Sequence, residues 1–537
     1  MKHPVRPETY RKSADLVSLK VFALTVLIAT SPVSSAQELI PGEVIATLKR
    51  SADWQIANRT EQNLNGWIIA PFYDGLLRTA DATGDANYLA EVLDLADAAH
   101  WAPGTRTYHA DDHAVGHAWV DIFLIDQTKA YRLTRTENRL DRVIANPITE
   151  ALEFGKPVTT PGVRVTDRWT WCDALYMAPP TLARLYSATG DTTYLDFLKQ
   201  EYLYTYNLLY DSAEGVFYRD SRYIDDLTPN GKKVFWSRGN GWVYGGLALL
   251  LDYLPQDHED RPFYEGLFQD MTVAVIAAQQ SDGLWRPSLA DPDHIPVGET
   301  SGSGFFTFGL AWGINNGLLD RATYWPVAEA GWRGLLTRLG TNGLVGYVQQ
   351  PGAAPAAFTA TSTREYGTGA FLLAGSEVLR AIGGAASIDP AVLLAAAEDI
   401  RNPPLPSETR MLVNLSTRLS VGPGDVGIQG FVAGGTGEMR VLVRAVGPGL
   451  SALGVPGAMP DPQLTLYEGS TPIAGNNDWD PDEIGDAFEL TGAFPFAIGS
   501  RDAALVVTIE PGKLYTAHVR GDDGGIVLIE AYDVPAE

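Results

Sequence analysis

The sequence predicts two domains of different class, an all-α (α/α)6 barrel followed by an all-β, sandwich-like C-terminal domain. Helical periodicity with aromatic-rich loops runs from about residue 40 to residue 382. A proline-rich stretch follows at 402–406. Beyond it, apolar residues recur with period two and glycines are frequent. A chain of 537 residues is long enough for both domains.

The helical part consists of a series of hairpins. Two connections are nearly identical, Ala-Thr-Gly-Asp-Ala-Asn-Tyr-Leu at 82–89 and Ala-Thr-Gly-Asp-Thr-Thr-Tyr-Leu at 188–195. In each, Gly can end one helix in the left-handed conformation and Asp can cap the next. Six such hairpins fit a closed toroid with an inner and an outer ring, and an open helical solenoid is the alternative. The expected helices span 41–56, 61–81, 86–99, 114–135, 138–153, 174–188, 192–208, 240–254, 260–279, 302–317, 321–338 and 366–381.

The C-terminal part contains short alternating segments separated by turn signals, which is typical of a β-sandwich. The expected strands span 411–415, 439–444, 463–467, 504–509 and 525–530. We therefore expect the barrel domain at 37–385, a linker at 386–406 and the β-domain at 407–537.

The first 36 residues have the pattern of a cleaved export signal. Basic residues precede an apolar run at 21–29, and Ser34-Ser35-Ala36 supplies small residues for a cleavage site. The apolar run is short for a membrane span. An uncleaved anchor is the less favoured interpretation. We expect a secreted or periplasmic protein that begins near Gln37 and has no membrane attachment after cleavage.

Charge and cysteine content exclude several classes of function. Lys and Arg total 40 and Asp and Glu total 65, so the formal net charge is −25. Such a surface repels phosphate backbones, and a nucleic-acid partner is not expected. Cys172 is the single cysteine, which excludes an intramolecular disulfide and a multi-thiolate metal site.

Asp173 is the first candidate for chemistry. It begins an apolar helix and is flanked by Trp171 and Met177. Indole surroundings remove hydration from a carboxyl group and raise its pKa towards that of a general acid. Asp is also a common helix cap, and the spacing alone leaves cap and catalyst equally open.

The stretch at 108–117 contains Asp111 and Asp112 beside three histidines. A metal site is not expected, because the chain has eight histidines and no His-Glu-x-x-His pattern or further ligand cluster. We expect one aspartate to cap the helix and the other to handle substrate or a proton.

Two further loops precede expected helices. Trp236 and Arg238 lie in Phe-Trp-Ser-Arg-Gly-Asn-Gly-Trp at 235–242, where Arg can grip a carboxylate while indole stacks on a sugar ring. Pairing of Arg238 with a neighbouring acid is the structural alternative. The loop at 299–309 is interpreted mainly as packing, with Glu299 or Thr300 as possible pocket residues.

Taken together, these motifs resemble glycoside hydrolase family 105, the unsaturated rhamnogalacturonyl hydrolases, which are related to the unsaturated glucuronyl hydrolases of family 88. The resemblance covers about residues 40–382 and implies an (α/α)6 barrel without metal or other cofactor. It implies removal of a 4,5-unsaturated uronyl residue from lyase-generated oligosaccharides of rhamnogalacturonan or a related polymer. The double bond is hydrated, and the resulting hemiketal opens and releases the remaining sugar.

The resemblance also assigns roles to residues. It implies that Asp173 donates a proton to C4 and activates the water, with Trp171 beside the substrate. Trp236 and Arg238 match the family's Trp-x-Arg substrate-binding pair, and Tyr73 matches a pocket tyrosine. The second aspartate of the family falls on either Asp111 or Asp112.

One position departs from the family pattern. Some members have a histidine after Phe-Tyr, where this chain has Arg219 followed by Asp220. Arg219 would suit an acidic or sulfated neighbouring sugar, or would pair with Asp220. The parent polysaccharide, which could also be an ulvan- or glucuronan-type polymer, stays open.

Other classes of function remain as alternatives. The first is a conventional inverting glycosidase, with Asp173 as acid and Asp112 as base. The second alternative is a polysaccharide lyase, although the sequence offers no clear Tyr/His or Lys base for that reaction. The last is a non-catalytic carbohydrate-binding protein on the same barrel.

Overall fold

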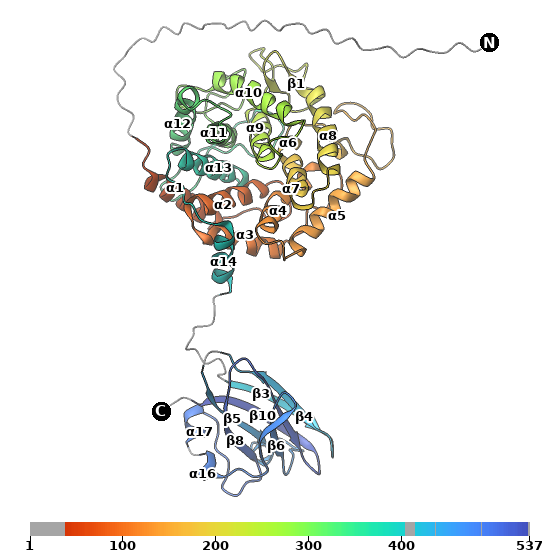
Figure 1. The fold of residues 1–537 in the computed structure, drawn as a ribbon, viewed down its shortest axis with the longest axis vertical. Helices are drawn as coiled ribbons and strands as arrows, with labels where there is room; N and C mark the ends of the chain where they lie inside the picture. Colours follow the sequence, from red (N-terminus) through yellow and green to blue (C-terminus); the bar gives the residue numbers. More distant parts are fainter. Residues whose placement is uncertain (1–37, 403–413, 435–436, 485, 535–537) are drawn as a thin grey trace, which may run out of the picture.

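The computed structural model describes residues 38–402, 414–434, 437–484 and 486–534 (Figure 1). The expected signal peptide lies outside the described residues. The described part forms a helical domain and a β-domain, each with its own hydrophobic core. Within the described residues, no helix combines the length and apolarity needed to cross a membrane.

The helical domain is a closed double ring, which confirms the (α/α)6 barrel. Each inner helix packs against the next, and the last, α13, packs against the first, α2, so the ring is closed and is not an open solenoid. The inner helices are α2 (Ala70–Thr83), α4 (Gly116–Ile125), α7 (Pro179–Thr189), α9 (Ser237–Leu251), α11 (Thr300–Asn315) and α13 (Glu365–Ala381). The outer helices are α1 (Pro41–Ala57), α3 (Ala86–Ala98), α5 (Tyr131–Ala145), α8 (Thr193–Leu209), α10 (Arg261–Ala278) and α12 (Arg321–Leu336).

The two repeated connections join helices as their residues predict. Gly84 and Gly190 end α2 and α7 with left-handed φ values of 70° and 76°. The Asp85 carboxylate accepts a hydrogen bond from the backbone N–H of Asn87 at the start of α3. Asp191 accepts the corresponding bond from Thr193 at 2.9 Å. The local sequence therefore determines both reversals.

Several helix boundaries differ from the sequence prediction for local reasons. The expected helix at 114–135 ends at Ile125, where Asp126 turns the chain by accepting a hydrogen bond from the N–H of Thr128. The expected helix at 174–188 is divided into α6 (Ala174–Met177) and α7, and the second begins with two prolines.

Half of the expected linker is a helix. α14 (Pro390–Arg401) is capped by Asp389 and packs on α3. Arg401 pairs with Asp94 and Asp97 of α3, and Arg132 of α5 pairs with Glu398. The residues between the domains therefore include a helix that belongs to the barrel, which corrects the predicted linker at 386–406.

The β-domain is a sandwich of two four-stranded antiparallel sheets, in the orders β3-β10-β5-β8 and β4-β9-β6-β7. Its strands are β3 (Asn414–Val421), β4 (Gly427–Val432), β5 (Met439–Val446), β6 (Gln463–Glu468), β7 (Thr471–Asn476), β8 (Ala503–Ile509), β9 (Leu514–Arg520) and β10 (Gly525–Val534). The sequence analysis missed β4, β7 and β9, and residues 411–413 of its first strand lie outside the described residues. Short helices cover the outer face of the first sheet: α15 (Pro448–Ala452), α16 (Pro481–Ile484) and α17 (Ala487–Thr491).

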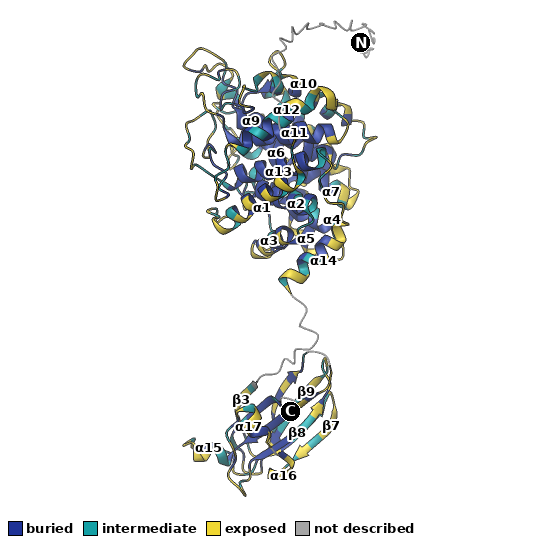
Figure 2. Cartoon of the chain, turned by 90° about the vertical axis from the view of Figure 1, so that its left-hand side faces the viewer, coloured by how far each residue is buried: buried dark blue, intermediate teal, exposed yellow. Residues whose placement is uncertain are grey.

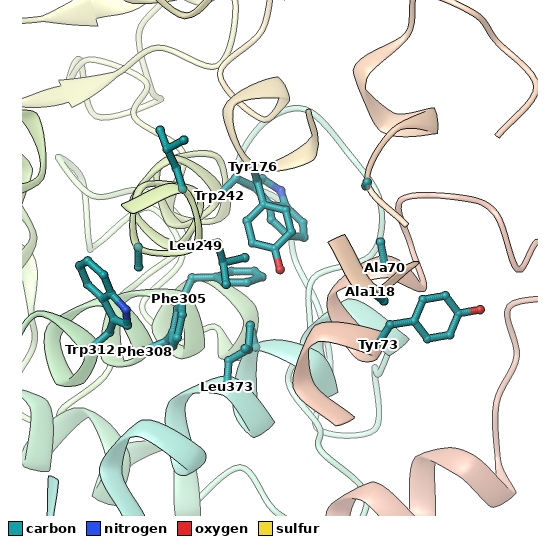
Figure 3. Close-up of a cluster of buried hydrophobic side chains, with 14 of the residues drawn as sticks. Ala70, Tyr73, Ala118, Tyr176, Trp242, Leu249, Phe305, Phe308, Trp312 and Leu373 are labelled. Carbon is teal, nitrogen blue, oxygen red and sulfur yellow. The ribbon is translucent and has the colours of Figure 1, made fainter. Parts of the chain in front are cut away.

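Burial is concentrated in the inner ring of the barrel (Figure 2). Every residue of α9 and α13 up to the last turn is buried, whereas the outer helices expose one face. Aromatic rings fill the centre, where Trp242 contacts Phe305 and Tyr176 at centroid distances of 4.5 and 4.8 Å (Figure 3). A filled centre leaves the ends of the inner helices as the places where a ligand can bind.

Candidate active site

Asp173 lies directly before α6, at the end of the barrel where the inner helices begin. An isolated bridge pairs Trp171 with Asp220, and the N–H of Cys172 donates to the Arg219 carbonyl at 2.8 Å. These backbone contacts join two segments about fifty residues apart in the chain. The sequence analysis treated Asp173 and Arg219 in separate motifs, and the fold places them side by side.

The Asp173 carboxyl is buried and is not used as a helix cap. Its residue occupies the N-cap position of α6, yet the side chain accepts no capping hydrogen bond. Arg219 Nε lies 3.3 Å from Asp173 Oδ2. Burial raises the pKa of Asp173, while the positive charges of Arg219 and Arg238 oppose the increase. The cap interpretation is therefore not supported, and the raised pKa agrees with the sequence prediction.

Arg219 connects Asp173 to a second buried carboxylate. Its Nη1 donates to Asp220 Oδ2 at 2.7 Å, and Arg222 also binds Asp220 through Nε and Nη2 at 2.9 Å each. The Phe154 ring lies beneath the Arg222 guanidinium. Of the two roles that the sequence left open for Arg219, the structure shows the pairing with Asp220.

Asp111 and Asp112 have different surroundings. Asp112 accepts hydrogen bonds from the Arg106 N–H at 2.6 Å and from Arg106 Nε at 2.9 Å. A Cβ on Gly104 would lie 2.5 Å from the Asp112 Cγ, so only glycine fits beside this carboxylate. Asp112 therefore holds the loop together.

Asp111 is the aspartate that interacts with Asp173. Burial raises the pKa of Asp111 to about 7, the negative charges of Asp173 and Asp112 add to the increase, and Arg106 opposes it. The Arg106 Nη2 is 3.7 Å from Asp111 Oδ2, a looser contact than the one Arg106 makes with Asp112. Two interacting carboxyl groups titrate as a pair, so the pKa of each depends on the charge of the other.

Each of the three histidines of this loop contacts a neighbouring ring, carbonyl or carboxylate. The His109 ring packs against Trp171 at a centroid distance of 4.9 Å, and burial lowers its pKa to about 3. His113 Nε2 is 2.9 Å from the Thr107 carbonyl, and His117 Nδ1 is 3.1 Å from Asp74 Oδ2. No group of three or more potential metal ligands occurs among the described residues.

Arg238 is buried and clamps a neighbouring loop. Its Nη1 and Nη2 donate to the carbonyls of Gln349 and Gln350 at 2.5 and 2.9 Å, and its Nε has no partner. The Trp236 indole lies beneath the guanidinium and donates to Gln349 Oε1. The structural alternative, a pairing of Arg238 with an acid, is not found among the described residues. The predicted grip on a substrate carboxylate stays a prediction, with only Nε unengaged.

Glu299 caps α11, as the packing interpretation of its loop implies. Its Oε1 accepts from the N–H groups of Ser301 and Gln349, and its Oε2 accepts from the N–H of Gly302. Tyr366 also donates to the Gln349 carbonyl at 2.6 Å. The 349–350 loop is thus fixed from α9, α11 and α13 together.

The structure does not bring Tyr73 to this group. Its hydroxyl donates to the Leu64 carbonyl at 3.1 Å, and its ring packs on Trp119 at 5.2 Å. Figure 3 shows it directed away from Tyr176. Helical periodicity explains the difference, because the side of α2 that carries Tyr73 faces α4 within the core.

Trp67 was missed by the sequence analysis. Its ring stacks on Tyr366 at 5.4 Å and meets Trp242 edge-on at 6.3 Å, and it is only half-buried. It therefore offers a partly open aromatic surface beside Arg238, whose guanidinium lies 4.9 Å from the Tyr366 ring. The sequence pattern that could have identified Trp67 is its position in Asn-Gly-Trp, just before an inner helix.

A cavity of about 660 Å³ lies at the opposite end of the barrel. Its walls come mostly from α2, the second half of α4, the end of α9 and the start of α14, with Arg184 from α7. Its arginines are already paired, Arg184 with Asp121 and Arg78 with Asp252. The carboxyl pair, the aromatic surfaces and Arg238 are all at the other end, so we place the active site there.

Comparison with known proteins decides the family. The sequence model of Glycosyl Hydrolase Family 88 matches residues 42–382. This chain belongs to that family. The family 88 enzyme is thus a glycoside hydrolase, and the resemblance to this group of enzymes is confirmed. The match ends where the barrel's α13 ends, so it covers the helical domain and not the β-domain.

Relatives of this family 88 enzyme cover the same region. The unsaturated 3S-rhamnoglycuronyl hydrolase of Formosa agariphila is 40% identical over 374 residues, which are 68% of this chain and 98% of that protein. The solved structure of a family 88 hydrolase from Bacteroides vulgatus is 31% identical with a TM-score of 0.57, covering 64% of this chain and 100% of that one. A solved structure described as a polysaccharide lyase is 29% identical with a TM-score of 0.58, covering 65% and 99%.

Proposed function

We propose that this family 88 enzyme is an exported unsaturated uronyl hydrolase. It removes the 4,5-unsaturated uronyl residue from the non-reducing end of lyase-generated oligosaccharides of the rhamnoglycuronyl type. The observation that carries this proposal is the 40% identity to the Formosa agariphila enzyme over almost its whole length. The buried Asp173 carboxyl, beside a second carboxyl and without a capping role, supplies a matching acid–base group.

The proposed reaction is hydration of the C4=C5 double bond. Protonated Asp173 donates its proton to C4, and positive charge develops at C5 and the ring oxygen. Water adds to C5 while the Asp173 carboxylate accepts a proton from it, so that one water is consumed and Asp173 is regenerated. The hemiketal at C5 then opens and expels the remaining sugar.

The surroundings of Asp173 suit this cycle. Burial favours the protonated form that donates, and Arg219, 3.3 Å away, stabilises the carboxylate that forms after donation. Asp111, with a pKa of about 7, can hold a proton near neutral pH. The half-buried Trp67 supplies an aromatic surface for the uronate ring, and the Arg238 guanidinium beside it supplies positive charge for the carboxylate.

The proposal is tested by offering the purified protein a saturated and an unsaturated disaccharide of the same sugars. We expect loss of the double-bond absorbance with the unsaturated compound and no reaction with the saturated one. Hydrolysis of the saturated disaccharide would instead show an inverting glycosidase. The Asp173→Asn variant serves as the matched inactive control.

A polysaccharide lyase is the second candidate, favoured by the 29% identity to a structure described as one. A lyase creates unsaturated ends from intact polymer, so absorbance from the double bond would increase and not fall. Intact ulvan-type and rhamnogalacturonan-type polymers are the substrates for this test. An increase with either polymer would replace the hydrolase by the lyase.

Export is part of the same proposal and rests on the first 36 residues. N-terminal sequencing of the protein from the medium or periplasm should begin near Gln37. Recovery of the protein from that fraction with Met1 still present would contradict cleavage.

A further inference from the structure

Helix α5 carries an arginine-rich face on the outer wall of the barrel. Its arginines recur at the i, i+4 and i+7 spacing that places side chains on one side of a helix. Together with the loop that follows α3, they enclose a surface pocket of about 200 Å³. The pocket is lined by Ala102, Pro103, Arg135, Asn138, Arg139 and Arg142.

The three arginines of this pocket are not engaged in ion pairs among the described residues. The described residues give Arg135, Arg139 and Arg142 no ion pair with an acid, although the chain as a whole carries −25. Burial lowers the pKa of Arg139 and the like charge of Arg142 lowers it further, while Asp112 opposes both. Glu137 projects about 200° around the helix from Arg135. Arg135 and Arg142 are exposed and therefore keep their guanidinium groups available to an anion.

The pocket adjoins the active-site loop without being part of it. Arg139 Nη1 donates to the Gly104 carbonyl at 2.6 Å, and the Gly104 N–H donates to the Asp112 carbonyl at 2.8 Å. Arg135 and Arg142 make no such contact with the loop. They are therefore free of the structural role that Arg139 has in supporting the loop of Asp111 and Asp112.

We propose that the α5 arginine pocket (Arg135, Arg139 and Arg142) is a secondary binding site for an anionic polysaccharide. The arginines at 135 and 142 lie about 10 Å apart along the helix axis, which is more than a single oxyanion spans. A chain with successive sulfate or carboxylate groups reaches both. Asn138 offers an amide to sugar hydroxyls, and Pro103 offers an apolar surface to a ring.

A glycan fits this pocket better than nucleic acid. The acidic surface around the basic patch repels a long phosphate backbone, whereas a short contact with a few anionic sugars remains favourable. Binding a polymer on the outer wall would keep the enzyme close to the source of its oligosaccharides and raise their local concentration. The proposal uses neither Asp173 nor the hydration reaction, so it stands independently of the proposed function.

The test measures binding of the full-length protein to dextran sulfate, with uncharged dextran of the same length as the control polymer. We expect binding of dextran sulfate at low salt and none of dextran. The Arg135→Ala/Arg142→Ala double variant should bind about tenfold more weakly. The Lys/Lys double variant should recover part of the affinity, because charge remains while the fork geometry is lost. Arg50→Ala, at an exposed arginine of α1, is the matched control and should bind like the parent protein.

Disaccharide hydrolysis is measured on the same variants. Both double variants should stay within about twofold of the parent in kcat/KM. Circular dichroism checks folding, and alanine at exposed helix positions is well tolerated. A loss of dextran sulfate binding with unchanged turnover supports a separate site. A parallel loss of turnover would overturn it and make the pocket part of the active site.

Two further results would also overturn the proposal. One is equal binding of dextran sulfate by the Ala/Ala variant and by Arg50→Ala. The other is binding of poly(U) RNA with the same dependence on Arg135 and Arg142 and with equal or greater affinity. Binding of polygalacturonate is measured last. If it binds, carboxylate groups are sufficient and sulfate groups are not required.

Discussion

The Nε of Arg219 lies 3.3 Å from Oδ2 of Asp173 while its Nη1 lies 2.7 Å from Oδ2 of Asp220. One guanidinium thus bridges a candidate acid–base group and a second buried carboxylate. Asp220 is itself bound by Arg222, so the bridge is fixed at its far end. The arrangement makes Arg219 a candidate positioning residue for Asp173, and its positive charge opposes the raised pKa of Asp173.

Asp173→Asn should abolish turnover and leave the fold intact. Asn keeps the shape of the side chain but cannot donate a proton to C4 or accept one from water. General acid–base groups contribute about 10²–10⁴-fold, and the loss of both steps should reach at least the upper end of this range. Because the Asp173 side chain makes no capping bond, little stability is lost. Steady-state kinetics and thermal melting check both expectations, and substantial residual activity would move the assignment to Asp111.

Asp111→Asn and Asp112→Asn should have different consequences. Asp112→Asn replaces an acceptor oxygen that faces the Arg106 donors, and should lower the free energy of unfolding by about 1–3 kcal/mol. Asp111→Asn should lose activity with little loss of stability at neutral pH. Denaturant unfolding and turnover of both variants test this division. A stable but inactive Asp112→Asn would reverse the two roles.

The pH dependence of stability should also identify Asp111. Its pKa in the folded protein, about 7, is above the value of an unfolded aspartate. The folded state therefore holds a proton that the unfolded state has lost, and the contribution of Asp111 to stability falls as pH rises from about 4 to about 7. Asp111→Asn should flatten this decline. Unfolding curves at a series of pH values provide the measurement, and an unchanged slope would contradict the raised pKa.

The pH profile of kcat/KM should move when Arg219 is replaced. The pair needs one proton, so the profile should be bell-shaped with its alkaline limb near pH 7. Arg219→Met removes a positive charge that opposes the raised pKa of Asp173, and both limbs should shift to higher pH. Arg219→Lys should restore most of the parent profile. Arg222→Met, which removes a charge bound to Asp220 and not to Asp173, is the matched control, and an equal shift in that variant would exclude a direct effect of Arg219 on Asp173.

Arg238→Ala should mainly raise KM, because it removes the candidate grip on the uronate carboxylate. It also frees the carbonyls of Gln349 and Gln350, so the loop should become more sensitive to proteolysis. Arg238→Lys should recover only part of both effects, since the fork geometry is lost. An unchanged KM together with a loosened loop would leave Arg238 with a purely structural role.

The sequence by itself determined the two domain classes and the order of the barrel helices. Gly84 and Gly190 end their helices and Asp85 and Asp191 begin the next ones, because these properties depend only on local backbone chemistry. The motif around Asp173 made that residue the candidate acid, which stays a prediction. The end of α4 at the Asp126 turn and the three missed strands were not predicted.

The tertiary structure alone decided which neighbours each charged group has. Asp111 and Asp112 are adjacent in sequence, yet the charge of Asp173 raises the pKa of Asp111 whereas Asp112 is bound by Arg106. Arg219 reaches Asp173 only through the contact of two distant segments. Tyr73 lies in the core because of the side of α2 that it occupies. Electrostatic and hydrogen-bonding partners depend on distances of a few ångströms, and only the closed ring of helices fixes those distances.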